Sequence, residues 1–346
     1  SLSFLEMQDI ICNPEDSKDP WFYLREWQTT AVIANGESTA SVNQTRRAYY
    51  PALGYRPLNR PKSINGIPVM WDSPVLHVSV NRLGCGAMRI TGTGIWGEPK
   101  DREEAKRVLL RAVELGVNLI DTADSYGPEV SERLIGETLH PYKAGLVIAT
   151  KGGYVRTGPN QWKPNIQPKH LREALEGSLK RLKVERIDVY QLHNTGDGTV
   201  KIADALGELA IMQSEGKIRH IGVSNFSVAQ LAEARSLVKV VSVQNRYNLG
   251  DRASEAVLRE CEKLSLPFLP WAPLGKSNTD ATTALEIVAR RHGATTGQIA
   301  IAALLAHSKM MLPIPGTSRV AHLEENIAAA GIELTDQDRR ELGLDK

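Results

Sequence analysis

The stretch ITGTGIWGEP, residues 90–99, carries three glycines at the spacing of a dinucleotide-binding fingerprint. The glycines are Gly92, Gly94 and Gly97, and the helix-like run DREEAKRVLLRAVELG follows them at residues 101–116. In a Rossmann fold the helix begins inside such a motif, so that its N-terminus faces the pyrophosphate. Whether the helix begins inside or after the glycines therefore distinguishes a Rossmann fold from another α/β fold.

From about residue 75 to the end, short apolar runs alternate with amphipathic helix-like segments. Eight runs read as strands, at 81–88, 117–121, 145–151, 186–193, 218–225, 240–245, 267–273 and 310–315. Eight βα units over about 270 residues match the size of one (β/α)8 barrel, whereas a doubly wound sheet usually needs fewer strands. We therefore predict an α/β chain whose residues 75–346 form a TIM barrel.

The glycine stretch agrees with the barrel rather than with a Rossmann fold. Trp96, Glu98 and Pro99 separate the glycines from the helix, which is predicted to begin near Asp101, a good N-cap. The proline also disfavours helical backbone at the residue before it. We interpret the glycines as a flexible loop after the first strand, bordering a substrate pocket together with Met88 and Trp96.

Composition and charge exclude several classes of protein. With 42% hydrophobic and 24% charged residues the chain is typical of a globular protein, and a net charge of +2 provides no basic field for nucleic acid or an anionic membrane. No apolar run of about 18 residues is present to span a membrane, and the first residues do not read as a secretory signal. We expect a cytoplasmic protein that binds neither nucleic acid nor membrane.

The chain contains three cysteines, Cys12, Cys85 and Cys261, which are too few and too scattered for a disulfide framework or a zinc site. They indicate a reducing compartment, and we expect Cys85 and Cys261 to be buried packing residues. No metal is predicted.

Residues 1–74 show little periodicity and mix tryptophans with turn-rich pieces such as GESTASVNQT at 36–45. We assign no fold to this N-terminal extension and expect it to be partly disordered. The glycosylation sequon NQT at 43–45 is interpreted as accidental, because no secretory signal accompanies it.

Polar residues end nearly every predicted strand of the barrel. Asp121 closes VNLID, Lys151 closes GLVIATK, and His193 closes RIDVYQLH. A barrel gathers the C-terminal ends of its strands into one mouth, where active sites form. One such residue is more often a cap or a turn residue, but a set with complementary chemistry predicts a site.

Lys151 would be costly if it were buried unpaired, and Asp121 is its natural counter-ion. Tyr126 follows Asp121 by five residues, and a cation beside the phenol would lower its pKa and make it a proton donor or acceptor near neutral pH. His193 supplies a hydrogen bond that could orient and polarise a carbonyl oxygen. Taken singly, the tyrosine has the alternative role of packing and the histidine that of a structural residue.

Seven motifs in order resemble the aldo-keto reductases: DTADSYG (121–127), ATKGG (149–153), YQLH (190–193), GVSNFS (222–227), VQNRYN (243–248), PWAPLG (270–275) and PIPGTSRVAHLEENIAAA (313–330). The resemblance covers about residues 76–345. It implies a (β/α)8 barrel that binds NADP(H) in an extended pose without a Rossmann domain and reduces an aldehyde or ketone. It places the catalytic tetrad on Asp121, Tyr126, Lys151 and His193, with Tyr126 as the general acid.

The resemblance also implies how the cofactor is held. Ser224, Asn225 and Gln244 would hold the nicotinamide carboxamide, a group that needs both donors and acceptors. Trp271 would stack on the nicotinamide ring, with a hydrophobe at the barrel rim as the alternative interpretation. The helix after the eighth strand would present its N-terminus to the cofactor, and a helix N-terminus attracts phosphate. The other residues that the resemblance places at the cofactor are Gly86, Ala87, Met88, Pro273, Leu274, Gly275, Gly316, Thr317, Ser318, Arg319, Glu325 and Asn326.

Within that set, Ser318 and Arg319 would meet the adenosine 2′-phosphate, and Glu325 and Asn326 the adenine. Substrate contacts are expected from Met88, Trp96 and Asn194. Many family members have lysine where this chain has Gly316 and arginine where it has His322, so we expect a modest preference for NADP(H), carried mainly by Arg319.

Two alternatives stay open. The segment GAMRITGTGIWG (86–97), at the start of the barrel, and the segment IPGTS (314–318), near its end, are similar to bacterial members that interconvert pyridoxal and pyridoxine. A nucleotide-binding regulatory subunit, like the potassium-channel β subunits of the family, is the alternative from a different functional class. Turnover of NADPH with an aldehyde distinguishes the enzyme from the regulatory subunit.

Overall fold

The computed structural model describes residues 63–64, 67–72, 79–275 and 279–345. The chain divides into two units, Ser1–Pro61 and Lys62–Lys346, and every described residue belongs to the second. Most of the predicted N-terminal extension, including Cys12 and the sequon, lies outside the described residues. So do residues 276–278.

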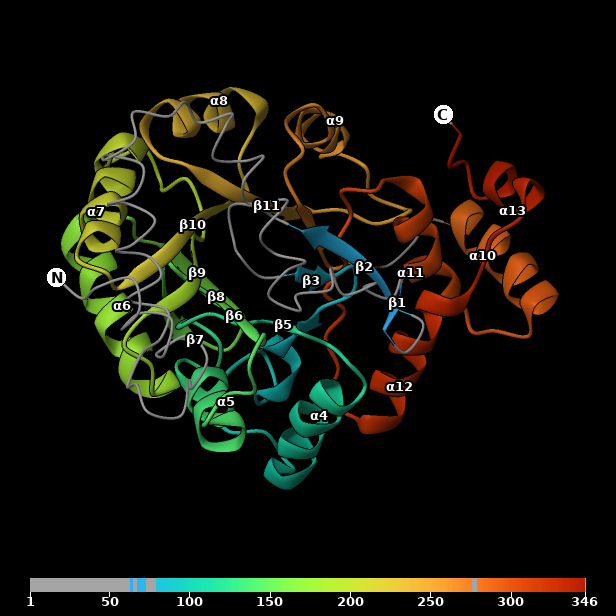
Figure 1. Cartoon of the computed structure of the whole chain (residues 1–346), viewed down its shortest axis with the longest axis horizontal. Coiled ribbons are helices and arrows are strands. Elements are labelled where there is room, and N and C mark those ends of the chain that lie inside the picture. The colour runs from blue at the N-terminus through green and yellow to red at the C-terminus, as the bar shows by residue number, and fades with distance from the viewer. Residues whose placement is uncertain (1–62, 65–66, 73–78, 276–278, 346) are drawn as a thin grey trace, which may run out of the picture. The chain divides into compact units, whose positions relative to one another are not determined.

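Seven parallel strands form a curled sheet that helices surround on the outside (Figure 1). In the order in which they pair they are β12 (Phe268–Trp271), β11 (Val240–Arg246), β10 (Ile218–Ser224), β9 (Ile187–Leu192), β6 (Val147–Gly152), β5 (Leu119–Asp121) and β4 (Cys85–Gly86). The order of the strands in the sheet follows the order of the predicted strands along the chain, as successive right-handed βα units require. The prediction of a TIM barrel is confirmed.

The eighth predicted strand, residues 310–315, closes this sheet as an extended segment rather than a regular strand. A parallel bridge joins Met311 to Phe268 of β12, and another joins Gly316 to Gly86 of β4. The backbone N–H of Gly84 donates to the carbonyl of Pro313 at 2.9 Å. Prolines at 313 and 315 have no N–H to donate, so a full ladder cannot form there. The eighth strand was therefore predicted in the right place but with too regular a structure.

Helices cover the outer face of the sheet (Figure 1). Asp101 caps the first of them, as predicted, because its side chain accepts from the backbone N–H of Glu104 at 2.8 Å. The helices are α4 (Arg102–Glu114), α5 (Val130–Leu139), α6 (Pro168–Leu182), α7 (Ile202–Ser214), α8 (Val228–Leu237), α9 (Glu255–Leu264), α10 (Thr279–His292), α11 (Thr296–His307), α12 (Val320–Ala328) and α13 (Asp336–Glu341).

The predicted strand at 81–88 is wrong in its extent. Asn81 ends β3 (Ser79–Asn81), which pairs with β2 (Ile67–Asp72) and, through it, β1 (Ser63–Ile64) in a small antiparallel sheet. Only Cys85–Gly86 joins the barrel, and the 3-10 turn η2 (Ala87–Ile90) follows directly. A Cβ on Gly86 would lie 2.6 Å from the carbonyl oxygen of Ile314, so the barrel closes on a bare backbone.

An antiparallel hairpin, β7 (Tyr154–Gly158) and β8 (Gln161–Pro164), is inserted between β6 and α6. It follows the C-terminal end of β6, which is the end where the barrel gathers its polar residues. The insertion was not predicted from the sequence, and it supplies part of the site described next.

The glycine stretch at 92–97 forms a closed loop. The N–H of Gly92 donates to the carbonyl of Gly97 at 2.9 Å, and the N–H of Ile95 returns to the carbonyl of Gly92 at 3.0 Å. Gly94 and Gly97 have φ of +71° and +69°, a region that favours glycine. The N–H groups of Gly92 and Gly97 already donate within the protein, and α4 begins only at Arg102, outside the motif. The rejection of the Rossmann interpretation is therefore confirmed.

Candidate active site

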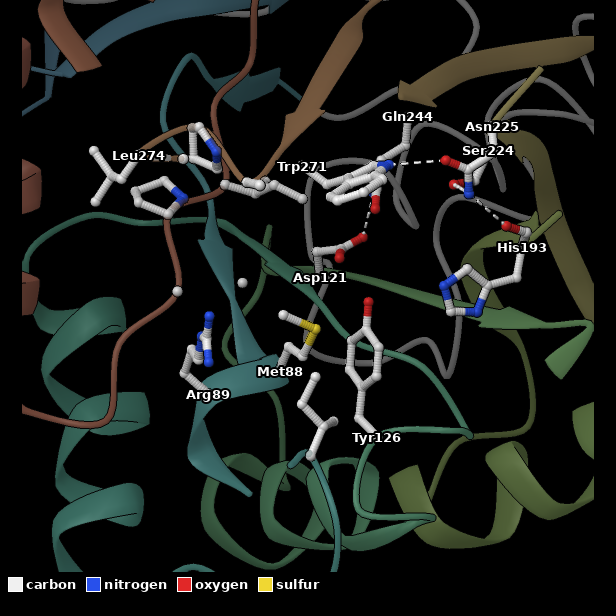
Figure 2. Close-up of a pocket in the computed structure, with 18 of the residues that line it drawn as sticks. Met88, Arg89, Asp121, Tyr126, His193, Ser224, Asn225, Gln244, Trp271 and Leu274 are labelled. Atoms are coloured by element: carbon white, nitrogen blue, oxygen red, sulfur yellow. Dashed lines mark hydrogen bonds between the residues drawn. The ribbon is translucent and has the colours of Figure 1, made fainter. Parts of the chain in front are cut away.

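A cavity of about 610 Å³ opens at the C-terminal ends of the barrel strands. Figure 2 shows its side chains converging from different strands and loops. It brings together most of the residues expected from the sequence, namely Gly86, Met88, Asp121, Tyr126, His193, Ser224, Asn225, Gln244, Trp271, Pro273, Leu274, Gly275 and Gly316. Arg89, Ile95, Tyr154 and Trp162 also line it and were missed.

Lys151 is fully buried at the end of β6 and pairs with Asp121 at the end of β5. Its Nζ lies 2.6 Å from Asp121 Oδ1 and donates to the carbonyl oxygen of Thr122, also at 2.6 Å. The third contact of the ammonium is the hydroxyl of Tyr126, at 3.4 Å. Adjacent parallel strands therefore place the ion pair directly behind the phenol.

The second oxygen of Asp121 is held by two amides. Gln244 Nε2 donates to Oδ2 at 2.8 Å and Gln191 Nε2 at 3.1 Å. Gln191 is fully buried on β9 and was not predicted as a site residue. Its only sequence signal was its place two residues before His193, within YQLH.

Burial raises the pKa of Tyr126, and the attraction of the neighbouring Lys151 charge offsets only part of that effect. The sequence-based expectation of a lowered pKa was therefore wrong in direction, because it counted the cation and not the loss of water. Burial also acts to lower the pKa of Lys151, but Asp121 and Tyr126 together raise it above its usual value. At neutral pH the phenol is protonated and the ammonium is charged.

His193 lines the cavity with its ring edge toward Tyr126, at 5.9 Å between centroids and 77° between planes. Burial, together with repulsion from the Lys151 charge, holds the pKa of His193 well below its usual range. The imidazole is therefore neutral at physiological pH. In that form one ring nitrogen carries a hydrogen and can donate it to a substrate oxygen.

Asn225 organises the neighbouring side chains at this end of the cavity. Its Nδ2 donates to the carbonyl of His193 at 3.0 Å and to Ser224 Oγ at 3.2 Å, while its Oδ1 accepts from Trp271 Nε1 at 2.9 Å. Both amide hydrogens are thus used within the protein. The Ser224 hydroxyl hydrogen and Gln244 Oε1 are therefore better placed than Asn225 to bond a carboxamide, a role that the family resemblance gives to all three residues.

Gly316 and Arg89 lie side by side in the same cavity, because a Cβ on Gly316 would sit 3.4 Å from Arg89 Cγ. Figure 2 places Arg89 on the opposite side of the cavity from His193. The guanidinium groups of Arg89 and Arg319 form no ion pair with any described residue. Among the residues of the last motif, Thr317 and Asn326 are buried, whereas Ser318, Arg319 and Glu325 are exposed. None of these five lines the cavity.

The N-terminus of α12 is partly occupied by a carboxylate. Glu104 Oε1 on α4 accepts the backbone N–H of Val320 at 2.8 Å, and this bond is the main cause that lowers the pKa of Glu104. The sequence predicts a phosphate at this helix end. A negative charge there works against a second anion.

Three further predicted residues lie behind or beside the cavity. Ala87 is buried in the η2 turn, and Trp96 packs near the inserted hairpin. Asn194 is buried and bonds the backbone of Gly153 and Gly196 through its side chain, so it holds the loop after β9. The structure does not bring Trp96 or Asn194 to the cavity surface.

A sequence profile of the Aldo/keto reductase family matches residues 82–343. An uncharacterized oxidoreductase of Schizosaccharomyces pombe is 52% identical over 259 residues, which cover 75% of this chain and 84% of the relative. Pyridoxine 4-dehydrogenase of Escherichia coli is 41% identical over 266 residues, covering 75% of this chain and 92% of that enzyme.

Among solved structures, an aldo/keto reductase of Klebsiella pneumoniae in complex with NADP and acetate superposes with a TM-score of 0.65. It is 25% identical, and the match covers 76% of this chain and 90% of that one. Among the described residues, no helix is long and apolar enough to cross a membrane.

Proposed function

This chain belongs to the aldo/keto reductase family, and from that premise we propose that it reduces an aldehyde or ketone to the alcohol with NADP(H) as the hydride donor. The observation that carries the proposal is the Tyr126 phenol, which faces the cavity with the Lys151 ammonium 3.4 Å from its oxygen. The family is one of oxidoreductases, and this chain retains the four side chains that the chemistry needs.

The residues present fit a nicotinamide cofactor. Trp271 lines the cavity with its indole anchored to Asn225, so its ring is held in place for stacking. The Ser224 hydroxyl and Gln244 Oε1 offer one donor and one acceptor beside it, which is the complement of a carboxamide. The NADP-bound relative of Klebsiella pneumoniae supports the same cofactor for this chain.

Proton transfer is the part of the reaction that this chain performs. When bound, NADPH supplies the hydride. The protonated Tyr126 donates to the carbonyl oxygen as negative charge develops there, and the neutral His193 donates a second hydrogen bond that orients the same oxygen. Lys151 then stabilises the phenolate, and Asp121 keeps the ammonium in place.

Pyridoxal is the specific substrate that we propose, with pyridoxine as the product. The relative from Escherichia coli is a pyridoxine 4-dehydrogenase, and it matches this chain over 92% of its own length. The cavity offers aromatic rings from Tyr154, Trp162 and Trp271 to a planar heterocycle. We place the activity in the cytoplasm, in keeping with the free thiols of Cys85 and Cys261, both of which are buried.

The activity is tested with purified protein, NADPH and a panel of aldehydes that includes pyridoxal, with NADPH absorbance as the readout. We expect turnover with several aldehydes and the highest kcat/KM for pyridoxal. Tight NADPH binding without turnover of any aldehyde would favour the regulatory-subunit alternative. Turnover that is poorest with pyridoxal would refute the specific substrate and leave the carbonyl reductase standing.

Carbonyl reduction is predicted to be independent of pH between about pH 6 and about pH 9, because the pKa of Tyr126 is raised above that window and the pKa of His193 is lowered below it. The reverse reaction needs the phenolate, so alcohol oxidation should increase with pH across the same window. Benzaldehyde and benzyl alcohol are suitable probes, since neither titrates. Loss of reduction with an apparent pKa near 6.5 would show that His193 changes charge during turnover.

Cofactor preference is predicted to depend on Arg319. Arg319→Ala should raise the dissociation constant of NADPH roughly tenfold, the worth of one charge-assisted hydrogen bond, and leave that of NADH unchanged. Arg89→Ala is the matched control, because a guanidinium beside Gly316 would meet the diphosphate that both cofactors share. We expect it to weaken both equally. Fluorescence titration of each variant with NADPH and with NADH gives the four dissociation constants. If Arg319→Ala weakened the binding of both cofactors equally, the assignment of Arg319 to the 2′-phosphate would be refuted.

A further inference from the structure

Arg156, on β7 of the inserted hairpin, is a buried arginine whose hydrogen bonds all go to backbone carbonyls. Its Nε donates to the carbonyl oxygen of Gln161 at 2.8 Å. Its Nη1 donates to the carbonyl oxygens of Ile95 at 2.8 Å and Ser125 at 2.9 Å. Its Nη2 donates to those of Gly94 at 3.0 Å and Gly158 at 3.3 Å. A guanidinium has five N–H donors, and all five are used.

No described carboxylate pairs with Arg156. Burial accordingly lowers its pKa, with no acidic neighbour acting against it. Because every donor is engaged, the side chain has none left for an anionic ligand. Lysine cannot replace it in this role, because an ammonium offers only three N–H donors from a single nitrogen, whereas the guanidinium spreads five donors over a plane. The arrangement therefore serves to hold backbone segments together.

The five carbonyls belong to three segments that surround the substrate end of the cavity. One is the glycine loop at 92–97, one is the catalytic loop at Ser125, directly before Tyr126, and one is the hairpin itself. A backbone bond from Asn160 to the carbonyl of Gly94 and a bridge between Trp96 and Gly127 reinforce the same junction. Of the three glycines in the phosphate-loop-like motif, Gly94 turns its carbonyl toward Arg156, and the carbonyl of the neighbouring Ile95 does the same.

The guanidinium also fixes an aromatic ring that faces the tetrad. The central carbon of Arg156 lies 3.8 Å from the ring centroid of Trp162 and 5.8 Å from that of Trp96. Trp162 lines the cavity, and its ring meets Tyr126 edge-on with the centroids 6.2 Å apart. Tyr154 packs against the same indole, with a centroid separation of 5.5 Å.

We propose that Arg156 is a positioning residue for the carbonyl substrate, which it serves by clamping the glycine loop, the catalytic loop and the hairpin into one wall with Trp162 at its face. The inference rests on the proposed function in so far as the substrate is a carbonyl compound. Arg156 touches neither the cofactor side of the cavity nor the reacting atoms. By fixing the wall that carries Trp162, it determines the position in which the substrate is held against Tyr126.

Arg156→Met and Arg156→Lys are compared with wild-type enzyme, using pyridoxal and benzaldehyde as probes. The methionine variant should lower kcat/KM for both aldehydes roughly ten- to hundredfold, mainly through KM, because small displacements at a reacting centre have effects of that size. The lysine variant should recover only part of the loss. The NADPH dissociation constant and the pH profile should be unchanged in both variants.

Arg82→Met is the matched control. Arg82 likewise donates to backbone carbonyls, those of Leu305 and Ser308, but it precedes β4 and so lies toward the N-terminal end of the barrel strands. Its loss should lower the melting temperature without changing KM. Equal KM effects in Arg82→Met and Arg156→Met, or a parallel loss of NADPH affinity in the Arg156 variants, would overturn the proposal.

A double-mutant cycle with Trp162→Leu tests whether Arg156 acts through this ring. If it does, the effects of Arg156→Met and Trp162→Leu on KM should be far from additive, whereas simple additivity would contradict the mechanism. Hydrogen exchange provides a readout without turnover. Amides at 92–97 and 154–164 should exchange faster in Arg156→Lys than in wild type, and unchanged exchange would refute the clamp even if no aldehyde proved to be a substrate.

Discussion

The buried ion pair between Lys151 and Asp121 is the interaction on which the rest of the site depends. An ammonium without exposed surface requires a partner, and removing one member of such a pair costs about 3–5 kcal/mol. Here each partner also bonds a functional side chain, since the ammonium reaches the Tyr126 hydroxyl and the carboxylate accepts from Gln244. One electrostatic contact therefore couples the acid of the proposed reaction to the side chain beside the proposed nicotinamide.

The barrel supplies the geometry that makes this pair possible. Asp121 and Lys151 end neighbouring parallel strands, whose register sets Asp121 opposite Ala149, two residues before the lysine. Barrel closure is completed by bare backbone, where Gly86 and Gly316 meet in a bridge that no side chain could enter. Because Gly316 has no side chain, room is also left beside Arg89 in the cavity, so closure of the sheet and the shape of this end of the cavity share one cause.

Much of this site could be predicted from the sequence, because barrel strands are short periodic runs and their polar ends fall in one place. Asp121, Lys151 and His193 were found in that way. Arg156 and Trp162 were not, since both lie on an inserted hairpin and Arg156 bonds a loop about 60 residues earlier in the chain. Glu104 at the start of α12 was missed for the same reason, because 216 residues separate it from Val320. The pKa of Tyr126 was predicted in the wrong direction because desolvation depends on packing, which a sequence motif does not contain.

We propose that the Tyr126 phenol is the proton donor and that Lys151 and Asp121 hold it in place. The most direct test is single-turnover reduction of pyridoxal by Tyr126→Phe preloaded with NADPH, followed by the loss of NADPH fluorescence. We expect an unchanged NADPH dissociation constant and a hydride-transfer rate lower by roughly 10²–10⁴-fold, the usual contribution of a positioned general acid. A rate near that of the wild-type enzyme would show that a group other than Tyr126 donates the proton.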